Sequence, residues 1–146
     1  MFPLIKEEIK IGELTLRFLF DGKDTDNSLV VFEMLVPPNT KVPAPHYHIH
    51  VDETLYVIEG TLHQLYGAET RVLNPGDKIF IKRGTVHGFN NTGTVAARVL
   101  CFLAPASIGP EYFREIAAVV NAGGPPDIQQ LLAIMKRHGL EPVKPA

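Results

Sequence analysis

Residues 46–60 of this chain read HYHIHVDETLYVIEG, and this stretch decides how the rest is interpreted. Side chains alternate between the two faces of a β-strand, so His46 and His48 point the same way and can share one ion. Glu53 follows and offers a carboxylate as a third ligand. A second stretch, GDKIFIKRGTVHGFNN at residues 76–91, adds His87 as a fourth candidate after a glycine-bearing turn. The sequence therefore predicts a metal site built on strands.

The chemistry of this donor set favours a divalent transition metal, with one ion expected per chain. Three neutral imidazoles and one carboxylate suit Fe, Mn, Ni, Zn, Cu or Co, and leave roughly two of six coordination positions open. Glu53 is also the candidate catalytic residue, because a carboxylate beside the ion can take a proton from a bound hydroxyl. Tyr56 and Phe89 are expected to line the pocket, Phe89 because it alternates with His87 along a strand.

The remaining polar candidates near the motif stay open. Tyr56 either offers its hydroxyl to the site or simply packs. His63 and Gln64 follow Gly60, and one of them must face inward, but strand parity carried across a turn does not decide which. His138, beside Gly139, is interpreted as a surface residue at a helix end.

Short apolar runs separated by turn residues indicate an all-β domain. The expected strands are 14–20, 29–36, 55–58, 61–66, 71–73, 78–81, 88–90 and 95–103. After them the apolar spacing changes to three and four, which predicts two short amphipathic helices, one from Pro110 to Gly123 and one from Asp127 to Gly139. Ile128, Leu131, Leu132 and Met135 are expected to form the apolar face of the second helix.

Composition excludes several classes of protein. The chain has 14 basic and 16 acidic residues among its 146, a net charge of −2, so no nucleic-acid partner is expected. The single cysteine, Cys101, excludes an internal disulfide framework and favours a cytoplasmic location. No membrane association is expected, because no run approaches the roughly 18 apolar residues of a span. Residues 1–8 become charged too early for a targeting segment.

The two histidine stretches resemble the two signature motifs of the cupin superfamily, in particular of small single-domain cupins similar to quercetin dioxygenase. The first motif runs through His46, His48, Glu53 and Gly60, and the second through Gly76, Gly84, His87 and Asn91. The chain departs from the family at Thr40, where a glycine is usual, and at Lys82, where a proline is usual. The family spacing selects His46 and His48 as ligands and leaves His50 at the mouth of the pocket or in solvent.

The resemblance implies a double-stranded β-helix, the cupin jelly-roll barrel, with two short C-terminal α-helices. A barrel at residues 1–105 and a helical extension at 106–146 packed on it are expected to form one domain. A homodimer is also expected, because the barrel's outer sheet and the stripe of Tyr112, Phe113, Ile116 and Val120 offer apolar surface, and cupins commonly bury such surface in two-fold dimers.

The resemblance also implies several activities, and one fold does not choose among them. The expected function is that of a metal-binding cupin, a dioxygenase-like oxidoreductase acting on a small enolisable or phenolic compound. The alternatives are a metal-dependent isomerase or lyase, and a non-catalytic cupin that only binds a small molecule. Consumption of dissolved oxygen distinguishes the first from the second, and turnover of any kind distinguishes both from the third.

Overall fold

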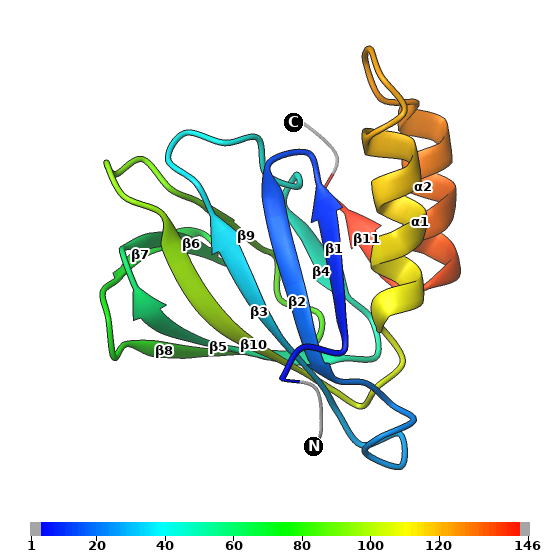
Figure 1. Ribbon diagram of the computed structural model, residues 1–146, viewed down its shortest axis with the longest axis horizontal. Coiled ribbons are helices and arrows are strands. Elements are labelled where there is room, and N and C mark those ends of the chain that lie inside the picture. Colours follow the sequence, from blue (N-terminus) through cyan, green and yellow to red (C-terminus); the bar gives the residue numbers. More distant parts are fainter. Residues whose placement is uncertain (1–3, 144–146) are drawn as a thin grey trace.

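The computed structural model describes residues 4–143, and the fold is built from two antiparallel sheets and two helices (Figure 1). Residues 1–3, part of the segment expected to carry no targeting signal, lie outside this range. The strands are β1 (Glu7–Ile11), β2 (Leu14–Phe20), β3 (Val30–Val36), β4 (His46–His48), β5 (Asp52–Glu59), β6 (Leu62–Tyr66), β7 (Glu69–Leu73), β8 (Lys78–Ile81), β9 (His87–Asn90), β10 (Ala97–Ala104) and β11 (Leu140–Pro142). The helices are α1 (Pro110–Val120) and α2 (Ile128–Arg137).

The order of the strands confirms the predicted jelly roll. One sheet has the order β1-β2-β3-β10-β5-β8 and the other the order β11-β4-β9-β6-β7. From β4 onward the chain passes back and forth between the two sheets, so that it coils around a shared interior as a double-stranded β-helix. Antiparallel sheets packed in this way cover their apolar faces with each other.

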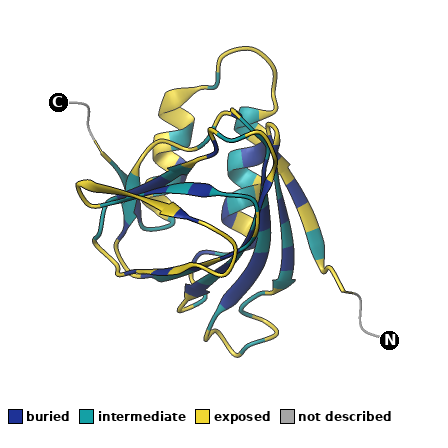
Figure 2. Ribbon diagram, turned by 90° about the vertical axis from the view of Figure 1, so that its left-hand side faces the viewer, coloured by how far each residue is buried: buried dark blue, intermediate teal, exposed yellow. Residues whose placement is uncertain are grey.

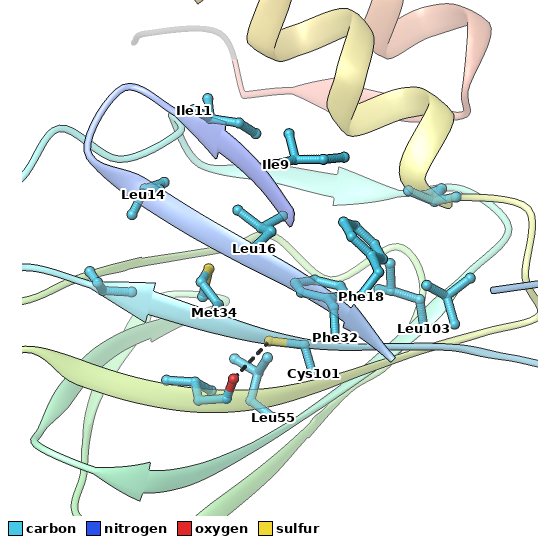
Figure 3. Packing of buried hydrophobic residues seen from close by; sticks show 14 of the residues in the cluster. Ile9, Ile11, Leu14, Leu16, Phe18, Phe32, Met34, Leu55, Cys101 and Leu103 are labelled. Atoms are coloured by element: carbon cyan, nitrogen blue, oxygen red, sulfur yellow. Dashed lines mark hydrogen bonds between the residues drawn. The ribbon is translucent and has the colours of Figure 1, made fainter. Parts of the chain in front are cut away.

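The core lies between the sheets and follows from the alternation of side chains along each strand. In β2, Leu14, Leu16 and Phe18 are buried while the residues between them are more exposed. Figure 2 shows buried and exposed positions alternating along the strands. Figure 3 shows Leu16, Phe18, Phe32 and Cys101 within this packing, where the buried Cys101 sulfur lies 3.9 Å from the carbonyl oxygen of Val99.

The structure explains the motif glycine at position 60 and the departure from the motif at Thr40. A Cβ on Gly60, which has φ +72°, would lie 2.4 Å from the carbonyl oxygen of Ala96, so only glycine fits there. At the position of the missing motif glycine, the left-handed conformation is found one residue earlier, at Asn39 with φ 54°. The Asn39 amide donates to the carbonyl oxygen of Asn91 over 2.7 Å. Asn39, and not Thr40, therefore takes the left-handed conformation at this turn.

Two strands escape sequence-based prediction. β1 contains only two apolar residues that alternate, Ile9 and Ile11, and its polar residues Glu7, Glu8 and Lys10 hide the pattern. β11 has three residues and ends in proline, which is too short for any periodicity to appear. β11 belongs to the predicted helical extension yet pairs with β4, so this extension also contributes to a sheet. The division of the chain at residue 105 stays a prediction.

The helices begin where the sequence predicts. Pro110 occupies the first turn of α1, and Asp127 caps α2 by accepting a hydrogen bond from the Gln130 amide over 3.1 Å. The predicted face of α2 is partly wrong, since Ile128 is 60% and Leu132 42% exposed. Ile134 is the buried residue of this helix, because α2 contacts α1 and β11 along a different line.

The apolar stripe of α1 packs on its own chain. Tyr112 is buried, and Phe113 stacks with Phe18 and Phe32 at ring-centroid distances of 5.6 and 5.3 Å. This stripe is therefore not a free surface for a second subunit. Neither helix of residues 4–143 has the length and apolar character that spanning a membrane would require.

Candidate metal centre

β4 carries two of the predicted ligands and is only three residues long. His46 and His48 lie on the same face of it, separated by Tyr47, as the alternation predicts. Their rings are stacked with centroids 5.2 Å apart. The Nδ1 atom of His46 donates to the carbonyl oxygen of Ala44 over 2.8 Å, which leaves Nε2 with its lone pair free.

His87 begins β9 and stands directly opposite His46 in the pairing of β4 with β9. Its Nδ1 lies 3.0 Å from the carbonyl oxygen of Thr85 and donates to it, so Nε2 again keeps its lone pair. The ring centroid of His87 is 4.7 Å from those of both His46 and His48. A carbonyl partner of this kind fixes the tautomer and the orientation of a ligating histidine.

The three imidazoles converge on one point. One nitrogen from each of His46, His48 and His87 lies within 4.8 Å of the other two, a spacing that a single ion can bridge. Nδ1 of His48 and Nε2 of His87 are buried and have no hydrogen-bond partner. Buried polar atoms are normally paired, and the unpaired Nε2 of His87, whose Nδ1 already donates to Thr85, fits the lone pair of a metal ligand. The residues present therefore suit a transition metal.

Glu53 borders this triad from the opposite sheet. Its Oε2 atom lies 3.0 Å from Nε2 of His87. Within its own sheet, Glu53 stands opposite Ile81 of β8 on one side and opposite Leu103 of β10 on the other. Both of these neighbours are 1% exposed. The structure thus brings Glu53 beside the ligands, and its role as a fourth ligand stays a prediction.

Burial and mutual contact set the pKa values of this group. Removal from water lowers the pKa of His46 and lowers that of His48 to about 4, so both imidazoles favour the neutral, metal-binding form. Burial acts to raise the pKa of Glu53, but the neighbouring imidazoles, His87 first, outweigh it and lower that pKa. Burial acts to lower the pKa of His87, and contact with Glu53 reverses this into a raised pKa.

The short strand β4 depends on its neighbours for its position. β11 pairs with all three of its residues, Leu140 opposite His48 and Pro142 opposite His46. The Ile49 amide donates to Gly139, and the Gly84 amide to the carbonyl of His48 over 2.8 Å. The chain after α2 therefore holds the strand that bears two ligands.

The loop before His87 is held from the other sheet. Arg83 binds Asp52 through its main-chain amide and through its guanidinium, at 2.9 to 3.1 Å. Asp52 directly precedes Glu53, so this ion pair ties the start of β5 to the turn that delivers His87. The pKa of Asp52 is lowered by the hydrogen bonds from Arg83. Arg83 therefore connects two parts of the site.

The other predicted site residues are divided between the two faces of the sheets. Phe89 stands opposite the buried Gln64 and packs against the core, as predicted from its parity with His87. Tyr56 does not line the pocket: it is 40% exposed and lies on the outer face of β5, one residue out of step with Leu55 and Val57. Alternation along the strand is the reason for this correction.

The structure also decides the choices that the sequence left open. Gln64 faces inward with 0% exposure, and His63 faces outward, near a surface hollow of about 310 Å³ over the outer side of β6 and β9. His50 is exposed beyond the end of β4. Leu62 is buried and Gln64 shares its face, but Leu65 of the same strand has the opposite parity, so the apolar residues alone do not reveal which face is inner. Asn91 has a structural role, donating to the carbonyls of Val36 and Val95.

Comparison with known proteins agrees with this geometry. The Cupin_2 cupin-domain family matches residues 32–103, which include every predicted ligand. The solved structure of the polyketide cyclase RemF from Streptomyces resistomycificus superposes with a TM-score of 0.57, is 31% identical, and the match covers 69% of this chain and 70% of that one. The chain belongs to the cupin superfamily.

Two curated relatives show the range of this superfamily. The tetracenomycin polyketide synthase protein TcmJ from Streptomyces glaucescens is 38% identical over 66 residues, which are 45% of this cupin and 44% of TcmJ. Quercetin 2,3-dioxygenase from Bacillus subtilis is 28% identical over 83 residues, 57% of this cupin and 24% of the dioxygenase. The matches thus span less than half of either relative.

Proposed function

We propose that this cupin is a metal-dependent enzyme that binds a small phenolic or enolisable compound through an ionised oxygen and adds dioxygen to it. The observation that carries the proposal is the convergence of His46, His48 and His87 within 4.8 Å, with Glu53 alongside. Three protein imidazoles around one ion leave coordination positions free for other molecules, which structural sites do not.

The residues of the site supply binding, proton transfer and a dry environment. When bound, a divalent transition metal would supply Lewis acidity and open coordination positions. Glu53 is placed to take the proton of the substrate hydroxyl, and its lowered pKa keeps it ionised for this role. The apolar residues Ile81 and Leu103 flank it and limit water, which strengthens the electrostatic effect of each charge in the site.

Three of the matched proteins support this substrate class. One relative is named as a quercetin dioxygenase, and quercetin is a flavonol. Two others are named as a polyketide synthase protein and a polyketide cyclase. Polyketides and flavonols share acidic hydroxyl or enol groups, so a common way of binding an ionised oxygen is consistent with all three.

The polyketide cyclase match also favours a second candidate, in which no oxygen is consumed. In that case Glu53 would move a proton on an enolisable carbonyl compound, as the isomerase or lyase alternative requires. The same ligands and the same base serve both reactions. We further place the protein in the cytoplasm, in keeping with its single buried cysteine.

Oxygen uptake tests the proposal. Protein loaded anaerobically with Fe(II), Mn(II) or Ni(II) is mixed with a flavonol, a catechol or an acidic 1,3-dicarbonyl compound, and dissolved oxygen is followed with an electrode. We expect uptake with at least one pair of metal and substrate. His87→Ala should abolish it, because this variant removes a ligand, whereas His63→Ala, on the outer face of β6, should leave it unchanged.

Other outcomes would decide against dioxygenation. Product formation without oxygen uptake would favour the proton-transfer reaction instead. Absence of both, with every metal and compound of the panel, would contradict the proposal. Full activity of His87→Ala would separate the reaction from this site.

A further inference from the structure

Gln64 is a polar residue whose side chain is buried inside the barrel. It lies on the inner face of β6, two residues after the buried Leu62, and is 0% exposed. Burying an amide is unfavourable unless its hydrogen bonds are made. Its presence inside the barrel therefore calls for a reason.

The amide of Gln64 makes one hydrogen bond with its nitrogen and none with its oxygen. Nε2 donates to the carbonyl oxygen of Leu65 over 3.2 Å. That carbonyl can only accept, so the nitrogen must be turned toward it, and the orientation of the amide follows. Oε1 is left as a buried acceptor without a partner.

The orphaned oxygen belongs to a short list of atoms. Among the residues that the structure describes, the buried side-chain nitrogen and oxygen atoms without a partner are Nδ1 of His48, Nε2 of His87 and Oε1 of Gln64. The first two belong to candidate metal ligands. The third belongs to an amide on the inner face of β6, in the sheet that also carries these histidines.

The register of the sheet places Gln64 near the metal ligands. Gln64 stands opposite Phe89 on β9, and His87 is two residues along the same face of that strand. Residues in this diagonal relation lie about 7–8 Å apart. A molecule held at the ion by one part and reaching Gln64 with another would therefore need only the size of a single aromatic ring.

We propose that Gln64 determines specificity by accepting a hydrogen bond from a hydroxyl group of the substrate, a group separate from the oxygens that bind the ion. This inference rests on the proposed function and names its substrate class more narrowly, as a polyhydroxylated aromatic or enolic compound. A site built to pair with a hydroxyl rejects an analogue that lacks one, because the buried acceptor is then left unpaired.

The test compares ligands that bind the ion alike and differ in one substituent. Binding to Ni(II)-loaded protein is measured anaerobically by calorimetry for catechol, pyrogallol and 3-methoxycatechol, and for 1,2,4-trihydroxybenzene and 4-methoxycatechol. We expect the third hydroxyl, in one of the two positions, to tighten binding about fivefold to tenfold over both the hydrogen and the methoxy analogue.

Two variants show whether Gln64 is responsible. Gln64→Met keeps the length of the side chain, and we expect it to retain metal and catechol binding but to lose the preference for the third hydroxyl. His63→Ala, the neighbour on the outer face, should keep the preference. Gln64→Leu replaces Gln64→Met in the same measurement if thermal melting shows that the latter does not fold.

The outcomes separate this inference from the proposed function. A preference that persists in the folded Gln64 variant would overturn the role of Gln64, and so would wild-type protein that binds catechol without any preference. Failure of wild-type, metal-loaded protein to bind catechol or any of its analogues would overturn the proposed function itself.

Discussion

Main-chain atoms fix the tautomers of two of the candidate ligand histidines. The carbonyl oxygens of Ala44 and Thr85 accept hydrogen bonds from the Nδ1–H groups of His46 and His87, and this leaves Nε2 of each ring with its lone pair. Burial lowers the pKa values of His46 and His48, so protons compete weakly with a metal for these rings.

For single residues of the site, we predict the metal content of two variants. Wild-type protein should carry close to one divalent transition metal per chain, and His48→Ala should lower the affinity at least about tenfold, since it removes a direct ligand. Glu53→Gln should lower the affinity too, because it removes the negative charge beside the ion. Elemental analysis after dialysis against a weak chelator measures both.

The matched control is His63→Ala, which should keep full occupancy because its ring lies on the outer face of β6. Undiminished metal content in both His48→Ala and Glu53→Gln would move the site away from these residues.

Among the elements, β11 has the clearest influence on the site. It pairs with every residue of β4, whereas the strand pairing of β9 with β4 is limited to His46 opposite His87. Leu140 is 3% exposed and stands opposite His48. The position of the ligands is therefore set by a segment that follows both helices.

We predict that Leu140→Ala weakens metal binding. Truncating a buried leucine costs about 2–5 kcal/mol of stability, and here the lost packing lies beside a ligand. Leu16→Ala serves as control, because Leu16 is 2% exposed on β2 of the other sheet and should cost similar stability. Calorimetric titration with Ni(II) should show weaker binding only for Leu140→Ala. Equal affinity of the two variants would contradict the role of β11.

The contact between the two helices predicts a dependence on pH. Glu115 of α1 accepts hydrogen bonds from His138 and from Arg137, and these two partners, His138 first, lower its pKa. A carboxyl with a lowered pKa stabilises the fold above its unfolded pKa of about 4.3, and this stability is lost as the pH falls below that value.

The melting temperature should therefore drop on acidification from about pH 5 downward, and Glu115→Gln should make this drop smaller. Melting followed by circular dichroism across this range measures both proteins. Parallel profiles would show that the helix contact does not respond to this carboxyl.

For the whole molecule, one group of apolar side chains lies on the outer face of the six-stranded sheet. Phe80 and Phe102 flank Thr54 in one row across β8, β5 and β10, and Phe80 is 57% exposed. Tyr56 lies on the same face. Because α1 buries its own stripe against the barrel, this sheet face is the surface that we propose for a two-fold homodimer.

Light scattering at micromolar concentration should then give about 32 kDa, twice the 16.1 kDa of the chain. Phe80→Glu should shift the mass toward the monomer, because it places a charge in the interface. Val72→Glu changes a residue of similar exposure, 54%, on β7 of the other sheet and should remain dimeric. A wild-type mass near 16 kDa would refute the dimer.

From the sequence alone, local periodicity indicated the all-β class and the two helices, and the resemblance to the cupin motifs indicated the jelly roll and the candidate imidazole ligands. Alternation puts His46 and His48 on one face whatever lies around them, and Asp127 caps its helix through a contact three residues away. The expectation that Tyr56 lines the pocket did not use this rule, since alternation from Leu55 puts Tyr56 on the outer face.

Tertiary structure decided what depends on residues far apart in the chain. β11 is too short to form a pattern and exists because β4 offers it an edge, and Ile134 is buried because α2 meets α1 and β11 there. Whether His63 or Gln64 faces inward depends on how the turn at Gly60 enters the second sheet. These features rest on contacts between segments that come together only when the two sheets close, and no local pattern encodes such contacts.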